Sequence, residues 1–155
     1  MEAGGLPMVI EFLERCEVIE ECYEFLLAYA GQGLPSDESA QRGGQVRNFL
    51  QRAAEALTGL GESCRHAIRD SDLEPPEQYE DFCSMLERDA RDSLAVIHIV
   101  MAQPSISSQL VDNLNASSHL RALLTDLFLI GEVLRTSAKS VLTSTDQGRP
   151  GISKD

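Results

Sequence analysis

The sequence predicts an all-α protein folded as an antiparallel, up-down-up-down four-helix bundle. The chain of 155 residues has 5% aromatic residues and no Trp, which favours helices packed through aliphatic side chains. Pro and Gly divide it into four long segments, and in each segment apolar residues recur at helical spacing, without the strict alternation of strands. Long amphipathic helices joined by short connections are typical of a bundle.

The first predicted helix extends from about Pro7 to Ala30. Proline suits the first turn of a helix, and the glycine-rich stretch 31–33 follows at its end. The apolar face predicted for this helix consists of Val9, Phe12, Leu13, Cys16, Ile19, Tyr23, Leu26 and Ala30.

The second predicted helix begins near Ser36 or Ser39, whose hydroxyl groups suit a helix N-cap, and it extends to Ile68. The pair Gly43-Gly44 lies close to its start. Its predicted apolar face consists of Val46, Leu50, Ala53, Leu57, Leu60, Cys64 and Ile68.

The third predicted helix follows Pro75-Pro76 and ends near Ala102, and the fourth extends from about Ser105 to Leu142. Residues 1–143 are therefore expected to form a single domain, and residues 144–155 a disordered tail. The apolar face of the third helix consists of Tyr79, Phe82, Leu86, Ala90, Ile97 and Val100. That of the fourth consists of Ile106, Leu110, Leu120, Leu124, Phe128, Leu134 and Leu142.

Charge and cysteine usage restrict the partners and the setting. A net charge of −12 argues against nucleic acid and against an anionic membrane surface, since both attract basic proteins. No signal peptide and no apolar run long enough to span a bilayer is evident. The four cysteines form no C-x-x-C pair, and Cys16 and Cys64 are expected to be small buried side chains. A reducing, cytoplasmic setting follows.

Several motifs typical of enzymes and metal sites do not occur in the sequence. A ferritin-type site needs Glu three residues before His, but Ser or Ala occupies that position before His66, His98 and His119. Neither a phosphate-binding P-loop nor a G-x-G-x-x-G fingerprint occurs. No catalytic residue, metal ligand or cofactor is therefore assigned.

One run in the fourth segment resembles the phosphoacceptor helix of sensor histidine kinases. It consists of Ser118-His119-Leu120-Arg121, followed by Leu124-Thr125 and Gly131-Glu132-Val133-Leu134. The resemblance implies that His119 accepts a phosphoryl group. The run has one residue fewer between the histidine and the Leu-Arg pair, and Leu123 stands where the family usually has Pro.

Several polar residues fall within or beside the apolar faces. Antiparallel packing brings them to one level, where they could form a polar layer of Glu20, Asp89, Ser93, Ser117 and Arg121. A buried carboxylate must be paired or neutralised, so Arg121 is expected to pair with Asp89 or Glu20. Two interpretations stay open. The layer either fixes the register of the helices or forms a pocket for a small ligand or a metal ion.

The first and fourth helices each carry a second apolar face. These faces consist of Val18, Cys22, Phe25 and Tyr29 in the first helix, and of Leu129, Ile130 and Val133 in the fourth. One core-facing stripe does not account for both faces, which predicts self-association as a symmetric dimer. The alternative is that tilted helices bury both faces in one core.

Three functions are compatible with these patterns. The leading interpretation is a non-enzymatic protein that binds another protein as an adaptor, regulator or assembly factor. The second is a bundle that binds a small ligand or metal in the polar layer, with or without catalysis. The third is a histidine phosphotransfer protein that uses His119.

Overall fold

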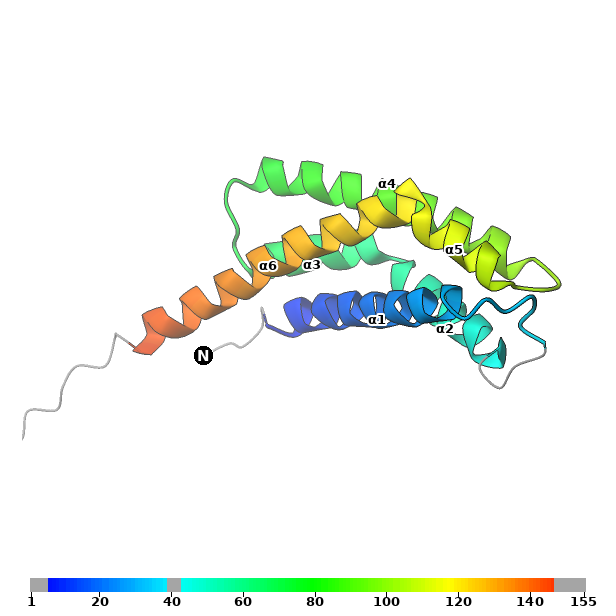
Figure 1. The fold of residues 1–155 in the computed structure, drawn as a ribbon. Helices are drawn as coiled ribbons and strands as arrows, with labels where there is room; N and C mark the ends of the chain where they lie inside the picture. The colour runs from blue at the N-terminus through cyan, green and yellow to red at the C-terminus, as the bar shows by residue number, and fades with distance from the viewer. Residues whose placement is uncertain (1–5, 39–42, 147–155) are drawn as a thin grey trace, which may run out of the picture.

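The computed structural model describes residues 6–38 and 43–146, apart from the side chains at 6, 43 and 140–146, and this part of the chain contains six α-helices and no β-strand (Figure 1). The predicted all-α class is confirmed. The predicted number of four helices is wrong, because two of the four segments are each broken into two helices. The helices are α1 (Leu6–Ala30), α2 (Gly43–Leu57), α3 (Leu60–Asp70), α4 (Pro76–Met101), α5 (Ser108–Ala116) and α6 (Ser118–Asp146).

The second predicted helix is broken at Gly59. This residue has φ 77° and ψ 11°, a left-handed conformation that glycine adopts at little cost and that ends a right-handed helix. The helix also begins later than predicted, at Gly43. Ser36 lies in the preceding loop, and Ser39 lies outside the described residues.

The fourth predicted helix is broken at Ser117. This residue has φ −58° and ψ 128°, which is extended rather than helical backbone. The break lets α5 pack against α1 while α6 packs against α4. Helix α6 extends to Asp146, so the boundary predicted between residues 143 and 144 falls inside this helix, and the residues after Asp146 lie outside the described part.

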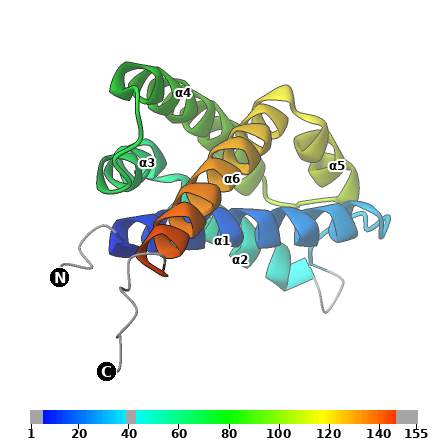
Figure 2. The same cartoon turned by 90° about the vertical axis from the view of Figure 1, so that its left-hand side faces the viewer.

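The helices form a layered arrangement in which neighbouring segments run in opposite directions. In Figure 1, α1 and α4 run in one direction, whereas α2 followed by α3, and α5 followed by α6, run back. Figure 2 shows α6 crossing obliquely between α4 and α1, both of which it contacts. No described helix is long and apolar enough to cross a membrane.

The core is one continuous cluster around α1, which contacts α2, α3, α5 and α6. Phe128, predicted in the core, is 57% exposed instead. Leu120 and Leu124 of the same predicted face are buried, but each step of four residues turns about 40° beyond a full helical turn, so Leu127 faces the core in place of Phe128. The largest fully buried side chains include Phe12, Tyr29, Leu50, Leu57, Leu60, Leu86, Ile97, Ile106, Leu123, Leu127 and Leu134.

Candidate functional site

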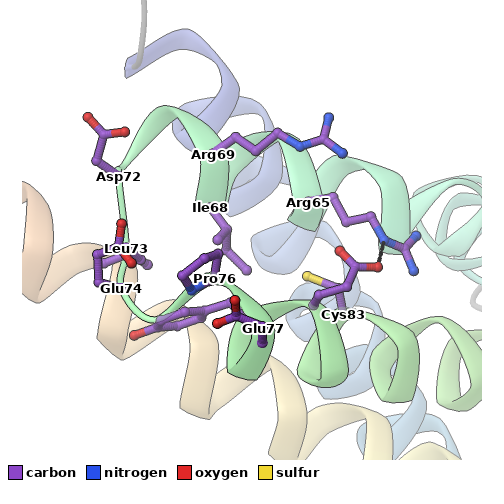
Figure 3. A pocket seen from close by; sticks show the side chains of 11 residues that line it. Arg65, Ile68, Arg69, Asp72, Leu73, Glu74, Pro76, Glu77 and Cys83 are labelled. Atoms are coloured by element: carbon purple, nitrogen blue, oxygen red, sulfur yellow. Dashed lines mark hydrogen bonds and ion pairs between the residues drawn. The ribbon is translucent and has the colours of Figure 1, made fainter.

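A cleft of about 450 Å³ opens where α3 turns into α4 (Figure 3). Helix α3 ends at Asp70, and the backbone N–H of Ser71 closes its last turn on the carbonyls of Ala67 and Ile68. Helix α4 then begins at Pro76, a residue suited to a first helical turn. The cleft is lined by Arg65, Ile68, Arg69, Asp72, Leu73, Glu74, Pro76, Glu77, Tyr79, Glu80 and Cys83.

Arg65 joins the two helices on one side of this cleft. Its Nε atom donates to Glu80 at 2.9 Å, and its Nη1 atom donates to Glu87 at 2.7 Å. The hydrogen bond with Glu87, and to a lesser extent the one with Glu80, raises the pKa of Arg65 above its ordinary value. The guanidinium group is therefore a fixed positive charge between α3 and α4.

Gly61 allows α3 and α4 to approach closely. A Cβ atom at this position would lie 2.8 Å from the Cβ atom of Glu87, closer than real contacts allow. We expect Gly61→Ala to lower the free energy of unfolding by about 1 kcal/mol, since overpacking outweighs the helix propensity gained. The matched control is Gly44→Ala, whose added Cβ meets nothing within 4 Å. Urea unfolding that shows both variants equally stable would contradict this explanation.

The cleft contains a thiol that is paired with a second one. The Sγ atom of Cys83 in α4 lies 3.4 Å from the Sγ atom of Cys64 in α3, and both side chains are buried. The predicted burial of Cys16 and Cys64 is confirmed. Burial, and next the charge of Glu20, raise the pKa of Cys16 to about 12, which makes that thiol inert.

The sequence did not predict the thiol pair. The two cysteines are 19 residues apart and belong to no local motif. A signal was nevertheless present, because Cys64 lies about two helical turns before the α3–α4 turn and Cys83 about two turns after it. In a helical hairpin, two such positions on the core faces come level with each other.

The residues of the predicted polar layer are only partly brought together. Ser93 is buried and its hydroxyl donates to the carbonyl of His119 at 3.1 Å, which joins α4 to the start of α6. Asp89 is half-buried and faces Asp126 of α6, a residue that the prediction missed. Burial, a hydrogen bond to Asp89 and the charge of Asp89 raise the pKa of Asp126 to about 8.

The other members of the layer lie elsewhere. Arg121 is exposed and makes no ion pair with any side chain that the structure describes, so the expected pairing with Asp89 or Glu20 is not formed. Glu20 is half-buried on α1, near Cys16. Ser117 occupies the break before α6, where its carbonyl accepts the N–H of Arg121 at 3.1 Å. The break displaces this end of α6 from the level expected for a continuous helix.

The second apolar face predicted for the first helix is largely part of the core. Cys22 and Tyr29 are buried, and Val18 and Phe25 are partly buried against the core cluster. The reason is that α2 and α5 both pack against α1 and cover this second face. The Tyr29 hydroxyl, for example, donates to the carbonyl of Ile106, just before α5, at 2.7 Å.

The second apolar face of the last helix remains in part at the surface. Ile130 is buried, but Leu129 is 58% exposed and Val133 is 38% exposed. Phe128, with its exposed ring, belongs to the same stretch of α6. These three side chains, Phe128, Leu129 and Val133, are called the α6 outer face below.

The histidine proposed as a phosphoacceptor lies at the surface. His119 is more than half exposed, with Nδ1 3.9 Å from a carboxylate oxygen of Asp92. Among the described residues, no three His, Cys, Asp or Glu side chains are grouped as a metal site requires.

Comparison of the chain with models of protein families, with curated proteins and with solved structures gave no match.

Proposed function

We propose that the chain is a non-enzymatic protein-interaction module that binds through the α6 outer face, and that its first partner is a second copy of itself. The observation that carries this proposal is the exposure of Phe128, Leu129 and Val133 on a helix whose opposite side is buried in the core. Burying apolar surface on association contributes roughly 25 cal/mol per Å² before the costs of binding.

The distribution of charge supports the same surface. Helix α6 contains equal numbers of basic and acidic residues, so the net charge of −12 lies on the rest of the chain. Two copies that meet through α6 therefore avoid most of the repulsion that two acidic surfaces would experience. Arg121 and Arg135 are exposed on this helix and available to acidic groups of a partner.

The path of the chain supports an outward-facing α6. In this proposal the six helices form an up-down-up-down four-helix bundle. Two of its four rods are broken, one into α2 and α3 and the other into α5 and α6. The α5 part of the last rod covers α1, while α6 keeps one side free of other described helices. Four buried cysteines without a disulfide bond fit the reducing, cytoplasmic setting in which such a module would work.

Substitution of Leu129 by Glu tests the proposal. We expect light scattering to show a symmetric dimer of the unchanged chain at about tens of micromolar. Leu129→Glu is expected to weaken dimerisation at least tenfold, about 1.4 kcal/mol, because it places a charge in the apolar contact.

The matched control is Ile99→Glu, which changes an exposed apolar residue on α4, at 63% exposure against 58% for Leu129. This variant should dimerise like the unchanged chain. A monomeric unchanged chain would reject self-association, and an equal loss in both variants would reject the α6 outer face as the contact.

A further inference from the structure

The sulfur atoms of Cys64 and Cys83 lie in contact, 3.4 Å apart, across the α3–α4 hairpin. A disulfide bond is about 2.05 Å long. The two sulfur atoms are 3.4 Å apart, so they need to approach by little more than an ångström. Both cysteines are on helices that are in close contact, since Arg65 of α3 bonds Glu87 of α4 and Gly61 of α3 lies against the same residue.

The two thiols have unequal chemical environments. A hydrogen bond with Cys64 lowers the pKa of Cys83, and the charges of Arg65 and Arg69 lower it further, against the effect of burial. The hydrogen bond with Cys83 and burial raise the pKa of Cys64. Cys83 is therefore the nucleophile of the pair, and Cys64 is the thiol that completes the bond.

Cys83 is buried, at 1% exposure, but it lies in the wall of a cleft that opens to solvent. Its side chain lines the α3–α4 cleft, and Figure 3 shows it beneath the arginine side chains. A cleft of about 450 Å³ is within the size range of small-molecule sites. Arg69 is exposed at its rim and makes no ion pair with the described side chains, so it offers positive charge to a carboxylate-bearing reagent.

We propose that Cys64 and Cys83 are a reversible redox site, oxidised to a disulfide by a small-molecule disulfide of the glutathione type that enters the α3–α4 cleft. The site is separate from the α6 outer face and does not depend on it. Its oxidation closes a covalent loop across the α3–α4 turn.

The reaction proceeds by two exchanges. The Cys83 thiolate attacks one sulfur of glutathione disulfide, which breaks that S–S bond and releases one glutathione thiolate, to be protonated by water. Cys64 then gives up its proton to solvent and attacks the Cys83 sulfur, which releases the second glutathione. Two protein thiols have lost two electrons and two protons, and the glutathione disulfide has become two thiols.

The experiment treats the intact, folded chain with glutathione disulfide and maps its thiols by mass spectrometry. We expect a Cys64–Cys83 disulfide to form at least about tenfold faster than Cys22 reacts, because burial raises the pKa of Cys22 whereas the hydrogen bond with Cys64 lowers that of Cys83. Oxidation should raise Tm by roughly 5 °C, since the link constrains the unfolded chain. Added reduced glutathione should reverse both changes.

Two variants distinguish the proposed order of steps. In Cys64→Ser, Cys83 should accumulate as a stable mixed disulfide with one glutathione, because no second thiol can displace it. In the control Cys16→Ser/Cys22→Ser, the pair should oxidise as in the unchanged chain. Bonding of Cys64 to Cys16, or no reaction of the folded chain, would overturn the proposal.

Discussion

Asp37→Ala is expected to lower the free energy of unfolding by about 3 kcal/mol, because this carboxylate joins two loops at one end of the molecule. Its Oδ1 atom accepts the backbone N–H of Ile106 at 2.7 Å, and its Oδ2 atom accepts Nε of Arg47 at 2.8 Å. The side chain is only 7% exposed. Removing it leaves a buried amide without an acceptor and a guanidinium group without its counter-charge.

The loss should depend on pH in a defined direction. Burial alone would raise the pKa of Asp37, but the hydrogen bonds from Ile106 and Arg47 lower it below the ordinary value. A depressed pKa means that the stabilisation is complete above the unfolded-state value, about 3.9, and is lost as the pH falls through the folded-state value. The difference between the unchanged chain and Asp37→Ala should therefore be constant from neutral pH to about pH 5 and shrink below pH 4.

Urea unfolding of both proteins at several pH values measures this difference. The neighbouring Glu38→Ala serves as the control, since Glu38 is exposed and its loss should change stability by less than about 0.5 kcal/mol. Equal stability of the two variants would show that the Asp37 bridge does not hold the loops together.

The helices bounded by strong local signals were predicted well. Pro7 and the glycines after Ala30 delimit α1, and Pro75-Pro76 and Pro104 delimit α4, so the predicted bounds lie within a residue or two of those observed. The breaks at Gly59 and Ser117 were missed. A single Gly or Ser is tolerated inside a helix, and only the packing of the whole molecule decides whether the chain bends there.

The polar layer also shows that local sequence signals predict positions within one helix but not contacts between helices. Asp89 and Ser93 lie within one unbroken helix, and counting turns placed both correctly on its inner side. Asp126 lies beyond the break at Ser117, where counting no longer holds, so the actual neighbour of Asp89 was missed and Arg121 was favoured in its place. Local periodicity predicts which face a residue occupies, whereas partners across helices depend on register.

The Asp89–Asp126 pair is expected to lower the stability of the fold at neutral pH, whereas Asp37 raises it. Asp126 is 6% exposed, and its Oδ2 atom has no hydrogen-bond partner among the described residues. Its pKa, raised from 3.8 to about 8 by burial first and then by Asp89, means that it keeps its proton at neutral pH. Burial and the neighbouring charge of Asp89 both disfavour a second negative charge here, so the protonated form of Asp126 is preferred.

The sign of the pH effect follows from that shift. Below about pH 4 both the folded and the unfolded chain hold the proton, so the pair costs nothing in stability. Between pH 4 and 8 the unfolded chain releases the proton and the folded chain keeps it, so the stability contributed by this residue falls as the pH rises. Above the folded-state value of about 8 the penalty is complete.

Asp126→Asn is therefore expected to raise the free energy of unfolding at pH 8 by about 2 kcal/mol. The amide N–H of Asn can donate to the Asp89 carboxylate without taking a proton from solution, so the variant should also lose the decline in stability between pH 4 and 8. Urea unfolding at pH 5, 6.5 and 8 would measure both effects. Asp112→Asn, at an exposed position on α5, controls for the change in net charge. If Asp126→Asn and Asp112→Asn follow the same pH dependence as the unchanged chain, then Asp126 is ionised in the folded protein, and the contact between α4 and α6 must stabilise a second negative charge.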